Sequence, residues 1–312
     1  MRIKNRFLIT SRNELEIRKV YEIAGVKFPL KRGVQQHDTN EKKIYEIAGE
    51  QFLLDPPSHL YILDLFSDTP EYKNLMTYLE EKRIDFHKTE DEVFTEQELW
   101  DAPLLRMVPN AHRGGYPQPI HGGKEKDYLS CSFDLQTGCP GSRCTRGLVQ
   151  NRPLRLSGGI KMGKTNDISG IWWLRDYIVT QKLRDLIEAA ELTGVEFWPI
   201  VKHGSGQPFE DLFQLKITGV LPPMSPKTVI EFDSLTGYKF ACEYGCGART
   251  VKGRVHYRAC DIASIPDFAL SQEWFGSGLE KWSWPFMSHR AYQLFHDNKI
   301  KGIRWYPPAI DE

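Results

Sequence analysis

The sequence has no excess of charge of either sign. Its 312 residues carry 41 Lys and Arg side chains against 41 Asp and Glu, so the formal net charge is zero. A chain without a net field has no general attraction for polyphosphates, and we see no local basic patch in the sequence. We therefore do not expect nucleic acid as a partner.

Long apolar runs are also missing. No segment approaches the roughly 18 consecutive apolar residues that cross a bilayer. The opening segment MRIKNRFLITS has neither the hydrophobic region nor the small-residue cleavage site of a secretory signal. We expect a cytoplasmic protein with no membrane partner. In that reducing compartment the six cysteines are expected to be thiols or metal ligands, not disulfides.

A repeat is the main feature that the sequence does contain. Residues 180–199 (TQKLRDLIEAAELTGVEFWP) align without a gap on residues 288–307 (SHRAYQLFHDNKIKGIRWYP), 108 positions later. In each copy a Thr or Ser precedes a helix with one apolar stripe, a Gly ends the helix, and an alternating strand runs to a Pro. We predict an α+β protein built from tandem helix-strand modules.

Weaker internal similarity extends toward the amino terminus. A degenerate third copy begins at Thr69 and lacks the Gly and the Pro. Residues 20–30 (VYEIAGVKFPL) resemble residues 44–54 (IYEIAGEQFLL), and both are predicted to form strand, Gly turn and strand.

These similarities predict two domains. Residues 1–105 are expected to form an N-terminal β-rich region with a degenerate module. Residues 106–312 are expected to form the duplicated domain, with halves at about 128–220 and 221–312.

A pair of cysteines precedes each strong copy of the repeat. Cys139 and Cys144 precede the first helix, and Cys242 and Cys246 precede the second. Tetrahedral zinc prefers four soft ligands on tight turns, and both pairs have Gly beside or between them. We predict one zinc-ribbon-like site to which each half contributes two thiolates. All four positions of such a site are filled by protein, so we expect a structural ion and no enzymatic activity.

Two alternatives to this zinc site remain open. Cys242, Cys246, His256 and Cys260 have C-x3-C-x9-H-x3-C spacing and could close a site within one module. The cysteines could also be thiols with no metal. Cys131 and Cys260 have no partner in the repeat, and we interpret both as packing residues.

Two further features of the repeat carry predictions. Asp167-Ile168 and Asp261-Ile262 precede the two helices and are expected to be equivalent. The aromatic pairs Phe197-Trp198 and Trp305-Tyr306 place large side chains on both faces of their strands. We favour packing between the modules, with a partner-binding patch as the alternative.

Together these segments resemble the double-CxxCG-motif proteins of bacteria. The resemblance covers residues 100–312, and the family's paired cysteines correspond to Cys139 and Cys144, then to Cys242 and Cys246 followed by Gly247. Both pairs are wider here than CxxC. Some family members are described as immunity proteins of polymorphic toxin systems. The resemblance therefore implies a non-enzymatic protein that neutralises a cognate toxin; the alternative is a zinc-dependent or thiol enzyme acting on a small molecule.

Overall fold

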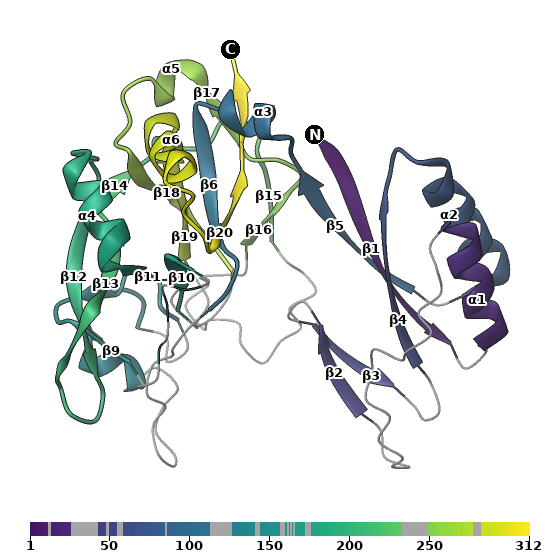
Figure 1. The fold of residues 1–312 in the computed structure, drawn as a ribbon, viewed down its shortest axis with the longest axis horizontal. Helices are drawn as coiled ribbons and strands as arrows, with labels where there is room; N and C mark the ends of the chain where they lie inside the picture. Colours follow the sequence, from purple (N-terminus) through teal and green to yellow (C-terminus); the bar gives the residue numbers. More distant parts are fainter. Residues whose placement is uncertain are drawn as a thin grey trace. The chain divides into compact units, whose positions relative to one another are not determined.

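The computed structural model describes most of the chain (Figure 1). The described residues are 1–11, 14–25, 43–47, 50–54, 59–84, 86–112, 127–140, 144–156, 160, 162, 164, 166–171, 176–232, 249–276 and 282–312. They form two compact units, unit 1 from Met1 to Thr95 and unit 2 from Glu96 to Glu312. Both units combine helices with a larger number of strands, which confirms the α+β class. Among the described helices, none has the length and apolar character that a membrane crossing requires.

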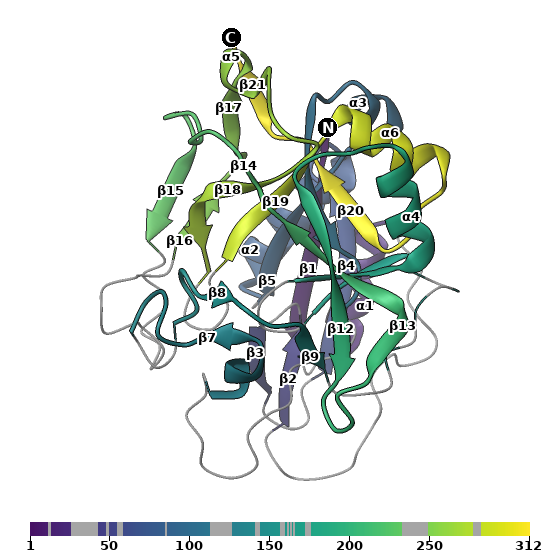
Figure 2. The same cartoon turned by 90° about the vertical axis from the view of Figure 1, so that its left-hand side faces the viewer.

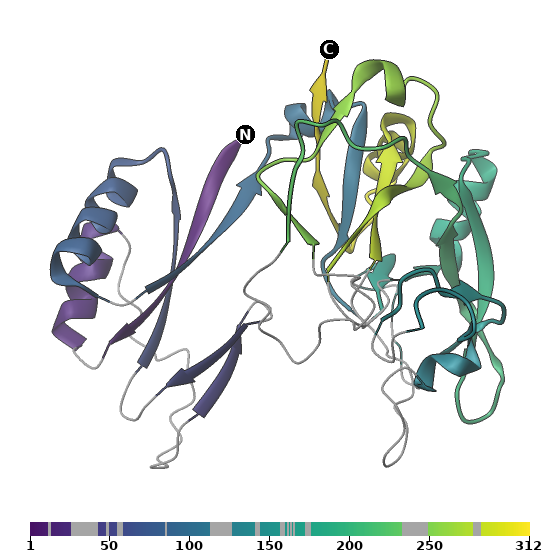
Figure 3. The ribbon, with the colours of Figure 1, turned by 180° about the vertical axis from the view of Figure 1, so that it is seen from behind.

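Unit 1 contains a three-stranded sheet with two helices on one face (Figures 1 and 3). Its strands are β1 (Arg2–Ser11), β4 (His59–Phe66) and β5 (Phe86–Val93), and its helices are α1 (Glu14–Ile23) and α2 (Pro70–Lys82). β1 is central and antiparallel to both neighbours. Phe7 and Ile9 of β1 pack with residues of both helices in the unit 1 core. A separate hairpin joins β2 (Lys43–Ile47) to β3 (Glu50–Leu54).

The pentapeptide YEIAG occurs twice in unit 1 and begins in two different conformations. Residues 45–47 lie in β2, as predicted, whereas residues 21–23 form the end of α1. The prediction of a strand at residue 20 is therefore wrong. Ile17, Val20 and Tyr21 are buried at helical spacing, so packing of one helix face decides the conformation. The rest of the first predicted hairpin, residues 26–30, lies outside the described residues.

Unit 2 contains two five-stranded sheets. The first sheet consists, in spatial order, of β10 (Ile168–Gly170), β11 (Tyr177–Thr180), β13 (Pro208–Ile217), β12 (Val195–Lys202) and β9 (Leu154–Leu156). The second sheet consists of β14 (Gly219–Val220), β18 (Phe268–Phe275), β19 (Trp282–Ser288), β6 (Leu104–Pro109) and β20 (Ile303–Tyr306). The boundary expected at residue 105 lies within β6.

Smaller elements complete unit 2. They are the helices α3 (Glu96–Trp100), α4 (Gln181–Ala189), α5 (Ala259–Ile262) and α6 (His289–Asp297), the 3-10 helix η1 (Asp127–Cys131), and the strand pairs β7 (Phe133–Asp134) with β8 (Val149–Gln150), β15 (Val229–Phe232) with β16 (Arg249–Lys252), and β17 (His256–Arg258) with β21 (Ala309–Asp311).

The two predicted helices α4 and α6 have the same caps at both ends. Thr180 and Ser288 accept hydrogen bonds from the backbone N–H three residues on, at 3.4 and 3.2 Å. After each helix one residue is left-handed, Glu191 at φ 50° and Lys299 at φ 52°. In unit 1, α2 has the same features, with a Thr69 cap and Arg83 at φ 52°.

One topology recurs around all three of these helices. A strand precedes the helix, a second strand follows it, and a third strand lies between those two and runs antiparallel to both. The central strand is β1 for α2, β13 for α4 and β6 for α6. Along the chain, however, β6 precedes the α4 segment and β13 precedes the α6 segment, so unit 2 exchanges its central strands.

Register shows that the exchange is reciprocal. We call residues 104–202 the first repeat and residues 212–311 the second repeat. Leu215 of β13 pairs with Phe197 and Tyr177, and Met107 of β6 pairs with Trp305. Met107 and Leu215 are 108 positions apart, as are Phe197 and Trp305. Each repeat thus supplies the central strand of the other repeat's sheet.

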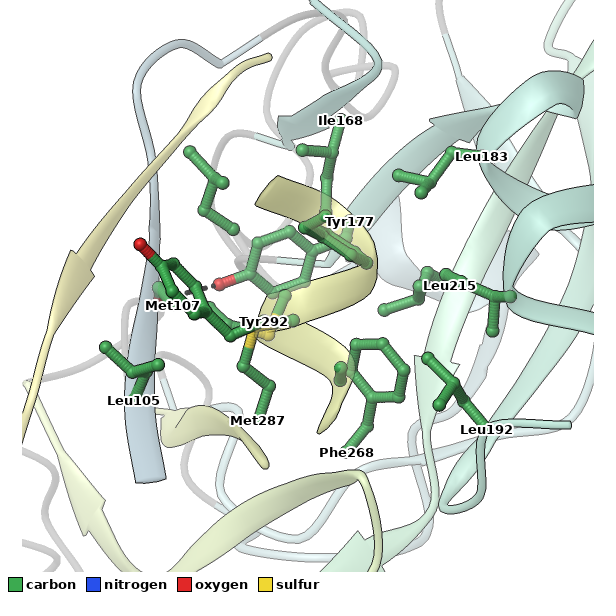
Figure 4. Packing of buried hydrophobic residues seen from close by; sticks show 14 of the residues in the cluster. Leu105, Met107, Ile168, Tyr177, Leu183, Leu192, Leu215, Phe268, Met287 and Tyr292 are labelled. Atoms are coloured by element: carbon green, nitrogen blue, oxygen red, sulfur yellow. Dashed lines mark hydrogen bonds between the residues drawn. The ribbon is translucent and has the colours of Figure 1, made fainter. Parts of the chain in front are cut away.

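Side chains of both sheets meet in a shared core beneath α4 and α6 (Figure 4). Tyr177 donates a hydrogen bond to the Met107 carbonyl at 3.1 Å and so joins β11 to β6. The opposite face of each sheet has its own apolar cluster. The first outer core includes Ile178 and Leu212, and the second includes Leu104 and Phe286. Alternation along each strand therefore divides its side chains between the shared core and an outer core.

Candidate metal centre

The first cysteine pair lies in the loop of a short hairpin. Strands β7 and β8 pair antiparallel, and the loop between them contains Cys139 and Cys144. Both side chains are buried and neither is in a disulfide. Two thiols held away from solvent in one closed loop have the environment that a structural zinc ligand requires.

Two glycines bring the ends of this loop together. Gly138 at φ 71° and Gly147 at φ 76° adopt conformations that disfavour a side chain, and a Cβ on Gly138 would collide with the Arg146 carbonyl. The N–H of Cys139 donates to that carbonyl at 2.8 Å. The two ends of the loop thus contact each other directly beside Cys139. Residues 141–143 lie outside the described residues.

The second cysteine pair, Cys242 and Cys246, lies outside the described residues. In the sequence it comes between β15 and β16, which pair antiparallel. Within the parts of the chain that are described, no group of three or more His, Cys, Asp or Glu side chains could hold a metal ion. The predicted four-cysteine set thus has one half described, and the zinc site stays a prediction.

The two hairpins occupy equivalent faces of their sheets. Phe133 of β7 belongs to the first outer core, and Ile230 and Val251 of β15 and β16 pack against the second. Both outer cores lie on the sheet faces turned away from the shared core. In Figure 2, α4 and α6 accordingly lie on one side of unit 2 and both hairpins lie on the other.

The alternative ligand His256 belongs to a polar cluster at the carboxyl end of the chain. Asp311 accepts hydrogen bonds from Ser225 Oγ at 2.6 Å and from Lys227 Nζ at 3.2 Å, and its other contact is His256 Nδ1 at 3.1 Å. The Ser225 hydrogen bond, followed by those of His256 and Lys227, lowers the pKa of Asp311 to about 2. Cys260 is exposed in α5, with its sulfur 3.6 Å from Asp261 Oδ1, so its interpretation as a packing residue is wrong.

This cluster does not have the order of a hydrolytic triad. A triad requires the serine hydroxyl to bond to the histidine, which is oriented in turn by the carboxylate. Here Asp311 lies between Ser225 and His256 and contacts both. The arrangement instead ties the last strand, β21, to β17 and to the turn that contains Ser225.

Sequence reasoning misidentified one acidic residue of the repeat. The expected equivalent of Asp167 was Asp261, which instead lies in α5 and bonds to Arg258 at 2.7 Å. The structural equivalent is Asp267, because it and Asp167 each bond to the turn that follows the other repeat's helix. These residues are 100 positions apart, so a gapless alignment at 108 could not pair them.

The aromatic pairs divide between the two faces of their strands. Phe197 and Trp305 pack against the shared core, which confirms that packing role for one member of each pair. Trp198 and Tyr306 are half-buried on the other face. Lys216 Nζ lies 3.5 Å from the centroid of the Trp198 ring, and the Arg106 guanidinium lies 5.3 Å from that of Tyr306. Each outer aromatic therefore has a cation against its ring.

Comparison with known proteins adds no assignment. No protein-family model matches the chain, and a comparison with curated proteins gives no significant match.

Proposed function

We propose that this protein is a non-enzymatic bacterial immunity protein that binds and neutralises a cognate toxin. One structural zinc ion, held by Cys139, Cys144, Cys242 and Cys246, belongs to this proposal. The sequence resemblance motivates it, and the outer aromatic residues of unit 2 supply the observation that carries it.

Trp198 and Tyr306 have the properties of interface anchors. They stand at equivalent positions of the repeat, are half-buried, and each has a cationic side chain over its ring. Trp198 Nε1 also donates to Glu196 at 2.9 Å, which holds the indole in one orientation. Trp and Tyr are enriched among the residues that dominate protein–protein affinity.

Binding to the toxin is tested with the reading frame beside this gene. We expect its toxic carboxyl-terminal segment to bind the purified protein and to lose its toxicity when both are co-expressed. Trp198→Ala should weaken binding about thirtyfold, which corresponds to roughly 2 kcal/mol. Val220→Ala is the matched control, since Val220 is an exposed apolar residue (59% exposed) on a different strand.

The outcome that contradicts this proposal is equally concrete. A neighbouring product that neither binds nor becomes harmless, in a protein whose thermal unfolding is normal, would remove the immunity function. Unchanged affinity in Trp198→Ala and Tyr306→Ala would leave the function in place and exclude this surface.

The zinc site is supported by the equivalent packing of the two strand pairs between which the cysteine pairs occur in the sequence. Each hairpin packs on the outer face of its own sheet, and the first loop buries both its thiols. A tetrahedral ion with two ligands from each loop would join the hairpins and have no open position for water.

Elemental analysis of Cys139→Ser and Cys242→Ser separates a structural from a catalytic ion. We expect one zinc per chain in the parent protein, and loss of zinc together with cooperative unfolding in both variants. Cys131→Ser, outside the proposed ligand set, should retain the ion. A parent protein without zinc would refute the site, and variants that stay folded but lose an activity would favour the enzyme alternative.

A further inference from the structure

We infer that the two repeats of unit 2 form a strand-exchanged pair that holds together without the covalent connection between them. That connection is the turn at residues 203–207, which joins β12 to β13 and is exposed throughout. A Cβ added at Gly204 or Gly206 would have no atom within 4 Å, so the turn makes no close packing contact there.

Completion of each sheet requires the other repeat. The first sheet would lose its central strand without β13 of the second repeat, and the second sheet would lose its central strand without β6 of the first. A split sheet of this kind leaves two strands with unpaired N–H and C=O groups on both sides of the gap. The two repeats are therefore complementary partners and not independent folding units.

Reciprocal hydrogen bonds join the repeats at a second place. Asp267 Oδ2 accepts from the N–H of Thr193 at 2.9 Å and from its hydroxyl at 3.1 Å. Asp167 Oδ2 accepts from the N–H of Lys301 at 3.0 Å. Thr193 and Lys301 are the equivalent residues before Gly194 and Gly302. Each repeat thus presents an Asp to the turn that follows the other repeat's helix, and we call these two contacts the reciprocal clasps.

The glycines of the clasps allow the closest approach. Gly194 at φ 79° packs on the Phe268 carbonyl, and Gly302 at φ 111° packs on the Ile168 carbonyl. A Cβ at either position would collide with that oxygen. Each repeat makes the same contacts with the other. The interface between the two repeats therefore has the symmetry of two molecules that exchange one strand.

Cutting the full-length chain tests this inference. A protease site inserted between Ser205 and Gly206 is cleaved after folding, and the product is analysed by native size-exclusion chromatography. We expect both fragments to elute as one species of the parent mass at micromolar concentration. Their unfolding should then depend on protein concentration, since each tenfold dilution lowers the apparent stability by about 1.4 kcal/mol. The uncut protein should show no such dependence.

A clasp variant tests whether the co-elution of the two fragments depends on the contacts described above. Asp267→Asn in the cut protein is expected to weaken association at least about tenfold, because an amide cannot replace the charged acceptor. Glu210→Gln removes an exposed carboxylate from the same exchanged strand, β13, and should change nothing. Fragments that separate at micromolar concentration, or that co-elute but unfold independently of concentration, would overturn the inference.

Discussion

Units 1 and 2 use the same strand, helix and strand arrangement but obtain the central strand from different places. In unit 1, β1 comes from the module's own chain segment and lies between β4 and β5. In unit 2, β6 and β13 lie in each other's sheets. The elements and their antiparallel pairing are the same, so local sequence determines the module, and contacts elsewhere determine which strand completes it.

The clasps are the clearest difference between the units. In both repeats of unit 2 a Gly follows the helix and packs on a carbonyl of the other repeat, whereas unit 1 has Arg83 and Ile84 after α2 and no Gly in that turn. Ile84 is buried in the unit's own core. The difference shows that a turn after a helix can serve either to close its own module or to bind a second one.

The largest expected effect comes from the clasp glycines. Gly194→Ala and Gly302→Ala should each destabilise unit 2 by about 3 kcal/mol or more, because the new Cβ collides with a carbonyl at a positive φ. All eight Trp residues lie in unit 2, so chemical unfolding followed by Trp fluorescence reports this unit alone. Gly204→Ala, in the exposed turn, should change stability by less than about 0.5 kcal/mol. Wild-type stability in Gly302→Ala would show that the clasps are not close-packed.

The two clasp carboxylates should differ in importance. Asp267 accepts from Thr193, from Ser288 Oγ at 2.7 Å and from Arg290 at 3.2 Å, whereas Asp167 bonds to Lys301 and lies 3.8 Å from Lys182. We expect Asp267→Ala to cost about 3 kcal/mol and Asp167→Ala about 1.5 kcal/mol in the free energy of unfolding. Urea denaturation of the two variants measures this difference, and equal costs would contradict the asymmetry.

A buried amide in the central strand of each unit gives the next comparison. Gln214 in β13 exchanges two hydrogen bonds of 2.8 Å with Gln150, so Gln214→Leu should destabilise unit 2 by about 1–2 kcal/mol. Asn5 in β1 is fully buried, and neither of its amide atoms has a partner among the described residues. Asn5→Val should therefore stabilise unit 1 by about 1 kcal/mol. Hydrogen exchange of the backbone N–H groups of β1 measures this change. Slower exchange in the parent protein than in Asn5→Val would indicate that the Asn5 side chain has hydrogen-bond partners.

The smallest effect concerns pH. Hydrogen bonds from Arg6 lower the pKa of Asp64 in unit 1 to about 2, and those of Ser225 and His256 lower the pKa of Asp311 in unit 2 to about 2. A lowered carboxylate pKa stabilises the folded state fully above the unfolded value near 3.8, and this stabilisation is lost as pH falls through about 2. Asp64→Asn should cost only about 0.5 kcal/mol at neutral pH, because the ion pair is partly exposed and water screens it. Acid titrations of Asp64→Asn and Asp311→Asn should both be flatter than that of the parent between about pH 4 and 2.

Local signals in the sequence located the start of each repeated helix and strand, but not every end. The predictions that Gly194 and Gly302 end the helices and that Pro199 stops the first strand are wrong, because α4 and α6 end at Ala189 and Asp297 and β12 continues to Lys202. Helices α4 and α6 begin after the predicted Thr and Ser, and strands β12 and β20 begin after the predicted Gly. Cap residues and apolar periodicity act over a few positions, so they can be read without the fold. The cysteine pair at Cys139 and Cys144 was also found in this way, and its burial agrees with the proposed role.

Features that depend on distant contacts could not be read from the sequence. The pentapeptide YEIAG ends helix α1 in one place and begins in strand β2 in the other, and in α1 the buried Ile17 and Val20 at helical spacing decide the conformation. The equivalence of Asp167 and Asp267 was hidden because their separation of 100 positions differs from the 108 that relate the helices. Nothing in β6 or β13 marks its pairing partner, since an apolar alternating strand suits either sheet.

The exchange of strands has a consequence for synthesis on the ribosome. The first sheet cannot close until β13 has been synthesised. Strand β6 is synthesised earlier still, and it has no strand to pair with until β19 and β20 follow in the second repeat. Folding of unit 2 is thus postponed until the second repeat has been synthesised, and the nascent chain must carry the unpaired apolar strand β6 until then. Premature termination inside the second repeat would release a polypeptide that chaperones and proteases recognise.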